Sequence, residues 1–147
     1  MQDVISREIL VKAGKEEVYN AIADPKKIIA WFPEAIESGT LEVGQRPILI
    51  FNGGKHKSQI YVEAVKPFDY FSYRWVPGGA GILGDVLAVP NTLVEFFIEE
   101  QKEGTKITVK ESGFSSLAPE VAEESFNQNS GGWEFMINRL EKLLNQE

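Results

Sequence analysis

The side chain in this sequence that is best placed to do chemistry is the carboxylate of Glu111. Pairing two predicted antiparallel strands from a turn at Lys102–Gly104 puts Glu111 opposite Val94, on an otherwise apolar face. Burying a carboxylate is costly unless it is paired, and burial is one route to acid or base chemistry. Two interpretations follow: a hydrated or helix-capping residue at the end of the sheet, which we favour, or a buried acid or base that works with Tyr73.

Three further polar-tipped side chains, Tyr73, Trp75 and Asn129, could point inward and orient a ligand within an otherwise apolar pocket. For the two aromatic residues, packing in the core is an equally good interpretation. Trp31 and Phe32 have the same ambiguity, because they either close one end of a space between helix and sheet or fill the core. We therefore predict a ligand-binding role for these residues and assign no catalytic residue.

His56 is the only histidine. We interpret it as an exposed turn residue, because it lies between two lysines just after a glycine turn. Without a second histidine or any cysteine, a zinc site lacks its preferred ligands, and no carboxylate pattern matches a calcium loop. The glycine-rich run Gly78–Gly81 lacks the Lys-Ser/Thr pair of a phosphate loop. We predict no metal and no cofactor.

The bulk composition narrows the class of protein. A chain of 147 residues suits a single domain, 1–147. Its net charge of −7 argues against nucleic acid as a partner, because such binding depends on lysine and arginine neutralising phosphates. No stretch approaches the ~20 apolar residues of a membrane span, and no basic region precedes an apolar leader. We expect a soluble, cytoplasmic protein with no membrane span.

The N-terminal region predicts one strand followed by two short helices. Alternation over residues 4–11 indicates the strand, and a helix beginning at Lys15 is ended by Asp24-Pro25. The expected second helix carries Ile28, Ile29, Trp31 and Phe32.

Six strands in a meander are predicted between Pro33 and Gly113. The expected turns are Glu42–Gly44, Asn52–Gly54, Lys66–Asp69 and Lys102–Gly104. For the last hairpin, the predicted pairs are Val94 with Glu111, Glu95 with Lys110, Phe96 with Val109, Ile98 with Ile107, and Glu99 with Lys106. For the hairpin at Pro67, the predicted pairs are Ile60 with Trp75, Tyr61 with Arg74, Val62 with Tyr73, and Ala64 with Phe71.

A long helix is predicted from Pro119 to about Asn145, with Ser115 or Ser116 as its cap. The apolar stripe that should cover the sheet consists of Phe126, Trp133, Met136, Ile137, Leu140, Leu143 and Leu144. Gly131-Gly132 interrupts this helix, which indicates close approach of another backbone or a ligand, or a bend. The segment Gly78–Val89 is longer than a hairpin loop and suits a flap.

Several motifs resemble, in order, the START-like (SRPBCC, helix-grip) superfamily, in the branch related to the C-terminal domain of the activator of heat shock protein 90 ATPase. These motifs are Glu17–Ile22 with Asp24-Pro25, Ile29–Pro33, Val43-Gly44, Val65–Trp75, Glu103–Val109, Ser112–Phe114, and Gly132-Trp133 with Leu140. The resemblance implies an α+β fold in which a curved antiparallel sheet of about seven strands wraps around the long C-terminal helix. It also implies a cavity between sheet and helix, with the segment Gly78–Val89 as its lid.

By that resemblance, nine residues are expected to line the cavity: Trp31, Phe32, Phe71, Tyr73, Trp75, Phe96, Val109, Asn129 and Trp133. With Glu111, which the strand register turns inward, ten residues are expected to bind a ligand. The leading hypothesis is a non-enzymatic protein, monomeric or weakly dimeric, that binds a small apolar or aromatic molecule. The alternatives are a chaperone-cofactor-like protein with a chaperone partner, and a cofactor-free cyclase, hydrolase or dehydratase.

Overall fold

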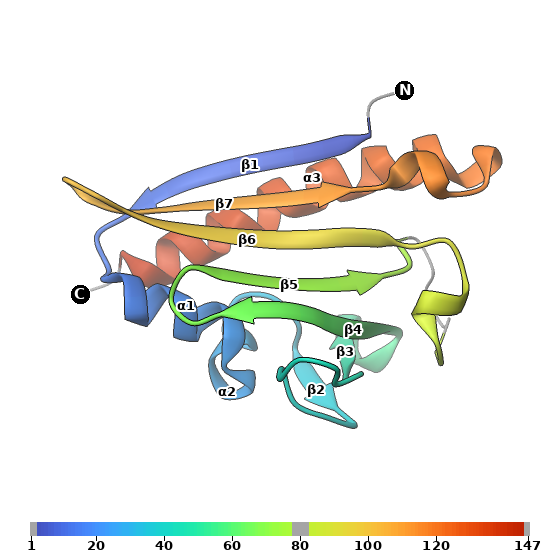
Figure 1. The fold of residues 1–147 in the computed structure, drawn as a ribbon, viewed down its shortest axis with the longest axis horizontal. Helices are drawn as coiled ribbons and strands as arrows, with labels where there is room; N and C mark the ends of the chain where they lie inside the picture. The colour runs from blue at the N-terminus through green and yellow to red at the C-terminus, as the bar shows by residue number, and fades with distance from the viewer. Residues whose placement is uncertain (1–2, 78–82, 146–147) are drawn as a thin grey trace.

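The computed structural model describes residues 3–77 and 83–145 of the chain. Within them, seven strands form one antiparallel sheet in the order β1-β7-β6-β5-β4-β3-β2 (Figure 1). The strands are β1 (Val4–Val11), β2 (Ala35–Glu37), β3 (Ile48–Phe51), β4 (His56–Lys66), β5 (Tyr70–Trp75), β6 (Thr92–Gln101) and β7 (Gly104–Ser112). The helices are α1 (Lys15–Ala23), α2 (Pro25–Ile28) and α3 (Pro119–Leu144), with 3₁₀ turns η1 (Asn52–Gly54), η2 (Val86–Ala88) and η3 (Phe114–Ser116).

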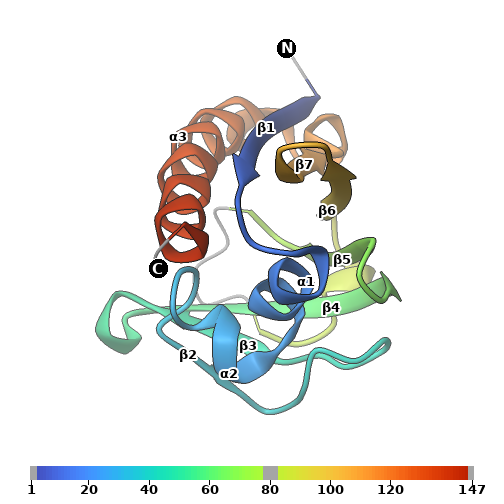
Figure 2. The same ribbon diagram turned by 90° about the vertical axis from the view of Figure 1, so that its left-hand side faces the viewer.

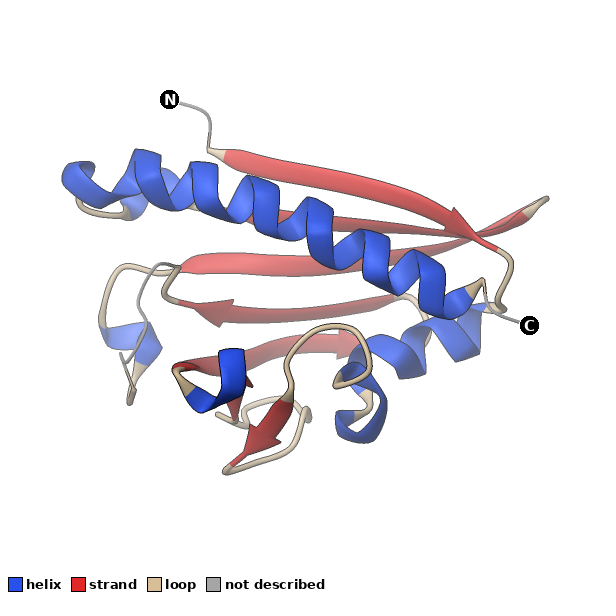
Figure 3. Cartoon of the chain, turned by 180° about the vertical axis from the view of Figure 1, so that it is seen from behind, coloured by secondary structure: helices blue, strands red, loops and turns tan. Residues whose placement is uncertain are grey.

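The sheet curls around α3, which confirms the predicted helix-grip architecture. In Figure 2 the strands β1, β7 and β6 lie on one side of the curl and β4, β3 and β2 on the other, with α3 on the open side of the curl. From behind, α3 runs along the length of the sheet (Figure 3). The helix buries an apolar face against the strands: Ala122, Trp133, Ile137, Leu140 and Leu144.

The register of the last hairpin is as predicted. Val94 faces Glu111, Phe96 faces Val109, and Ile98 faces Ile107 on the inner side; the outer pairs Glu95 with Lys110 and Glu99 with Lys106 also match. Lys106 Nζ lies 3.6 Å from a carboxylate oxygen of Glu99, as an exposed cross-strand ion pair. This register turns the side chain of Glu111 toward α3.

The register of the neighbouring hairpin is only partly as predicted. Ile60, Tyr61 and Val62 have the expected partners on β5, but Ala64 faces Ser72 rather than Phe71. An irregularity between Val62 and Ala64 inserts one extra residue into β4, so every pair nearer the turn is displaced by one. The prediction assumed a constant sum of paired numbers, which a β-bulge breaks.

The second helix is shorter than predicted, because α2 ends at Ile28 and Trp31 and Phe32 follow it in a turn. Pro33 has no backbone N–H and disfavours helical geometry in the residue before it, so the helix cannot extend through Phe32. Trp31 is fully buried, and its Nε1–H donates a 2.8 Å hydrogen bond to the carbonyl oxygen of Ala21 in α1. Phe32 is buried next to it.

The start of α3 differs from the prediction in its cap. Pro119 is the first helical residue, as expected, but the capping position is Ala118, which makes no side-chain capping bond. Ser115 and Ser116 belong instead to η3, where Ser116 Oγ donates to the carbonyl of Gly113 at 2.7 Å. The predicted serine cap is therefore wrong, because a 3₁₀ turn consumes both serines before α3 begins.

Gly131 and Gly132 are exposed in the middle of α3. A Cβ built on either glycine would have no neighbouring atom within 4 Å in the part of the chain that the structure describes. The expected close approach of another backbone is therefore wrong for the described residues. Of the two glycines, only Gly132 lines the pocket described below.

Candidate ligand-binding pocket

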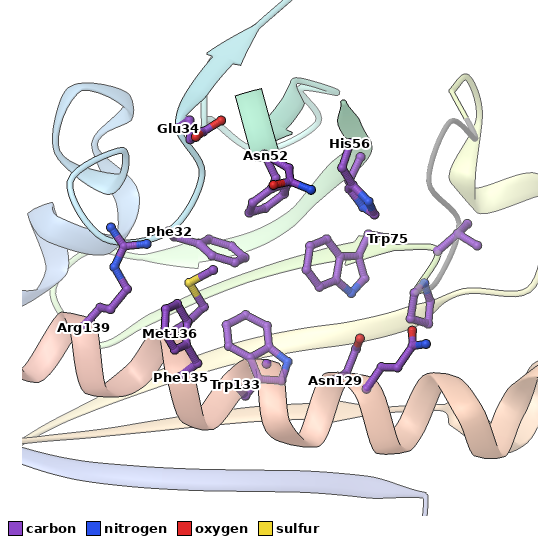
Figure 4. A pocket seen from close by; sticks show the side chains of 16 residues that line it. Phe32, Glu34, Asn52, His56, Trp75, Asn129, Trp133, Phe135, Met136 and Arg139 are labelled. Atoms are coloured by element: carbon purple, nitrogen blue, oxygen red, sulfur yellow. The ribbon is translucent and has the colours of Figure 1, made fainter. Parts of the chain in front are cut away.

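A pocket of about 520 Å³ lies between α3 and the end of the sheet formed by β3, β4 and β5 (Figure 4). The strands contribute a floor and one wall, and one face of α3 contributes the opposite wall. The lining residues are Phe32, Glu34, Phe51, Asn52, His56, Ser58, Trp75, Val76, Pro77, Gln128, Asn129, Gly132, Trp133, Phe135, Met136 and Arg139.

Aromatic rings form the inner wall of this pocket, with Phe32 at their centre. The centroid of Phe32 lies 5.2 Å from that of Trp133, 5.4 Å from Phe51 and 6.0 Å from Trp75. The two tryptophan rings are themselves 6.0 Å apart. Phe135 extends this apolar surface toward solvent, since the residue is 62% exposed. Such a wall suits a flat apolar molecule.

Polar side chains gather at the rim of the pocket. Glu34 accepts a 2.6 Å hydrogen bond from the backbone N–H of Gly53, which ties the rim to η1. Arg139 lies over the ring of Phe135 with its Cζ atom 5.9 Å from the ring centroid. His56 and Asn52 line the pocket on the side opposite α3, as Figure 4 shows. The rim can therefore hydrogen-bond a polar substituent while the inner wall holds a ring.

Behind the aromatic wall, the carboxylate of Glu111 is fully buried and accepts four hydrogen bonds. Its Oε1 atom accepts from Trp133 Nε1–H at 2.7 Å and from Asn129 Nδ2–H at 2.9 Å. Its Oε2 atom accepts from Trp75 Nε1–H at 2.8 Å and from the Thr92 hydroxyl at 2.5 Å. The favoured interpretation of Glu111 as a hydrated or helix-capping residue is therefore wrong, because tertiary packing surrounds it completely.

Tyr73 is buried beside this network, on the inner face of β5. Its hydroxyl has no hydrogen-bond partner among the described residues. Burial, and secondarily the negative charge of Glu111, raise the pKa of Tyr73 well above the usual tyrosine value. Neither Tyr73 nor Glu111 lines the pocket, so the hypothetical acid–base pair does not face a molecule bound there.

Of the ten residues predicted to bind a ligand, the pocket brings together four: Phe32, Trp75, Asn129 and Trp133. The other six are packed beneath the wall as core: Trp31, Phe71, Tyr73, Phe96, Val109 and Glu111. The prediction could not separate these two groups, because side chains that line a cavity and side chains that fill a core have the same apolar pattern in sequence.

Several pocket residues escaped the prediction. His56 is not an exposed turn residue: it begins β4, is half-buried, and its ring meets that of Phe51 edge to face at 5.8 Å. Phe135 could have been recognised from the sequence, because it is an aromatic residue on α3 that lies outside the apolar stripe and is therefore exposed. The sequence does not mark Asn52 and Arg139 as pocket residues, because exposed polar residues next to a turn or on a helix are common.

The structure describes only part of the expected lid, because residues 78–82 of the segment Gly78–Val89 lie outside the described residues. In the described part, Val86 is buried and Asp85 pairs with Arg46 at 2.7 Å. Residues 83–89 do not line the pocket, whereas Val76 and Pro77, just before the segment, do.

No three or more histidine, aspartate or glutamate side chains in residues 3–77 and 83–145 are grouped so that they could hold a metal ion. None of the helices described has both the length and the apolar character that crossing a membrane requires.

Comparison with solved structures shows the same fold in other proteins. Protein MLL2253 from Mesorhizobium loti is 22% identical with a TM-score of 0.77, covering 96% of this chain and 96% of that one. DynU16, from the dynemicin biosynthetic locus, is 25% identical with a TM-score of 0.76; the match covers 98% of this chain but 48% of DynU16. The Aha1 dimer from Colwellia psychrerythraea is 19% identical with a TM-score of 0.74, covering 98% and 97%.

No match is found among curated proteins. The family model described as Activator of Hsp90 ATPase homolog 1-like protein matches residues 12–145. This range includes α1, α2, α3 and the strands β2 to β7, and it begins directly after β1. The seven-stranded curved sheet around a C-terminal helix is the helix-grip architecture that the sequence motifs predicted. The chain therefore belongs to the family of Activator of Hsp90 ATPase homolog 1-like proteins, within the START-like superfamily.

Proposed function

We propose that this protein binds a small, flat, apolar or aromatic molecule in the pocket between α3 and the strands β3 to β5. The observation that carries the proposal is a pocket of about 520 Å³ with an aromatic inner wall and a polar rim. Small-molecule sites have volumes of about 300 to 1,000 Å³ and the same mixture of apolar walls and few polar groups. DynU16 comes from a biosynthetic locus, a setting that suits a protein handling a small molecule.

The proposal predicts that naphthol, as a model ring with one polar group, stabilises the protein. Ligand at a hundredfold excess over its Kd should add about 2.7 kcal/mol to the free energy of unfolding. Thermal melts with increasing naphthol measure the effect, and proton–nitrogen correlation spectra locate it through the indole signals of Trp75 and Trp133. The proposal fails if a panel of naphthol, naphthoate and longer-chain apolar molecules moves neither the melting temperature nor these signals.

The two helix glycines provide a matched pair of variants. Gly131→Ala and Gly132→Ala should each raise the free energy of unfolding by about 1 kcal/mol, because alanine is the better helix former and neither Cβ meets a neighbour. Only Gly132 lines the pocket, so only Gly132→Ala adds a methyl group there. We expect Gly132→Ala to weaken naphthol binding about tenfold, because the added methyl group takes up space in the pocket that the bound ring would otherwise use.

Calorimetric titration of both variants tests this prediction, with Gly131→Ala as the control for the change in helix stability. Equal affinity of the two variants for naphthol would show that bound molecules do not lie against this turn of α3.

A second candidate function is interaction with a chaperone, which the family match over residues 12–145 favours. In this case the outer surface of the protein, rather than the pocket, makes the contact, with the protein as a monomer or weak homodimer. Co-purification with a chaperone of the heat shock protein 90 type and stimulation of its ATPase activity would support it. Trp75→Leu separates the two candidates, since it should weaken naphthol binding and leave a surface contact intact.

A further inference from the structure

Three side chains of the pocket wall, Trp75, Trp133 and Asn129, donate hydrogen bonds to the same buried carboxylate. We propose that Glu111 is a positioning residue, whose carboxylate fixes both tryptophan rings and so sets the shape of the pocket that the ligand meets. This inference rests on the proposed function and identifies the group that prepares the site for it.

The hydrogen-bond geometry explains why a carboxylate stands at this position. Each oxygen of Glu111 accepts two hydrogen bonds, which is the full complement for an ionised carboxylate acting only as acceptor. Trp75 comes from β5, Thr92 from β6, and Trp133 and Asn129 from α3. One anion on β7 therefore joins the helix to the sheet at the inner wall of the pocket.

The orientation of the Trp133 indole depends on this acceptor. An indole has a single polar atom, Nε1–H, and Trp133 is 2% exposed, so any other ring orientation would bury that donor without an acceptor. The rings of Phe32 and Phe96 pack against Trp133 and limit its plane, while the bond to Glu111 fixes which edge points inward. Packing and hydrogen bonding together leave one arrangement of the wall.

This arrangement also defines the class of ligand. Because both indole N–H groups are already bonded to Glu111, the inner wall presents ring surface and no indole donor. Hydrogen bonding to the ligand then has to come from other lining side chains, and Asn52, His56 and Arg139 offer polar groups at the rim. We infer a ligand with a flat aromatic ring that enters first and one polar group that stays at the rim.

Glu111→Gln tests the positioning role, because glutamine keeps the shape and replaces one acceptor oxygen by an N–H₂ donor. The Thr92 hydroxyl and the Asn129 amide can turn to accept a hydrogen bond, but an indole N–H cannot. In either amide orientation, one of Trp75 and Trp133 therefore meets a donor instead of an acceptor. We expect at least one of their two indole N–H signals to move in proton–nitrogen correlation spectra.

Trp31 is an internal reference in the same spectrum, since its indole donates to the carbonyl of Ala21 and not to Glu111. In Glu111→Gln the Trp31 signal should stay in place. The affinity of this variant for naphthol should fall about tenfold, because one tryptophan of the wall is misplaced. A matched control is Thr105→Val. Thr105 lies on β7, near the end of the strand away from Glu111, and its hydroxyl donates a part-buried hydrogen bond to the carbonyl of Ala13. This control should leave the Trp75 and Trp133 signals and the naphthol affinity unchanged.

Asn129→Ala is the second variant, which decides the question if Glu111→Gln does not fold. It removes one donor from Oε1, so the signal of Trp133, which shares that atom, should move while that of Trp31 does not. The inference is overturned if the indole signals of Trp75 and Trp133 stay in place, or if Thr105→Val moves them equally. If the wild-type protein binds no member of the panel of naphthol, naphthoate and longer-chain apolar molecules, the proposed function fails while the indole signals still test the positioning role.

Discussion

Replacing Glu111 by leucine is expected to lower the free energy of unfolding by about 3 to 5 kcal/mol, in the range seen when one partner of a buried charged group is removed. Leucine has a similar volume, so the effect is not that of a cavity. It is the loss of the acceptor for four buried or half-buried donors, from Trp75, Thr92, Asn129 and Trp133. Each buried donor left without an acceptor costs roughly 1 to 3 kcal/mol.

Urea unfolding followed by far-UV circular dichroism measures this loss, which is large against the total stability of about 5 to 15 kcal/mol of a typical domain. Glu99→Leu is the control, because Glu99 is an exposed carboxylate on β6 whose pair with Lys106 spans 3.6 Å. Exposed pairs contribute about 0 to 1 kcal/mol, so this variant should be close to neutral. Similar losses for the two variants would mean that the buried network does not stabilise the fold as its geometry indicates.

Gly104→Ala is expected to destabilise the protein by at least about 3 kcal/mol, through overpacking against backbone combined with unfavourable φ. Gly104 begins β7 with φ +155°, and a Cβ built on it would overlap the backbone carbonyl of Val11 at the end of β1. Val11 is paired with Thr105 in the sheet, so neither strand can move away without breaking hydrogen bonds.

Gly44→Ala is a control that separates these two contributions. Gly44 has φ +87°, yet a Cβ there has open space among the described residues, so alanine should cost only the roughly 1 to 2 kcal/mol of left-handed backbone. Chemical unfolding of both variants measures the difference. If Gly104→Ala costs no more than Gly44→Ala, the contact between β1 and β7 at this position is looser than the structure shows.

The two central hairpins show how far sequence periodicity determines pairing. For β6 and β7, the apolar pairs on one face and the Glu–Lys pairs on the other require the same register, and the structure has that register. For β4 and β5, the prediction holds at Ile60 to Val62 and then fails, because a bulge leaves no mark in a simple alternation of apolar and polar residues.

The order of the elements, the length of α3 and the register of β6 with β7 follow from the sequence alone. They depend on local signals: the period of apolar side chains, the position of proline and glycine, and the complementarity of neighbouring strands. These signals also placed Glu111 on the inner face of the sheet, opposite Val94.

Only the tertiary structure decided what Glu111 contacts and which aromatic residues line the pocket. The donors to Glu111 lie 18 to 36 residues away in sequence, on three other elements, and no periodic pattern links them to it. Phe96 and Trp133 look equally apolar in sequence, yet Trp133 lines the pocket and Phe96 packs beneath it. The distinction arises because a cavity is space left between distant elements, and that space is set only when α3 and the curved sheet are packed together.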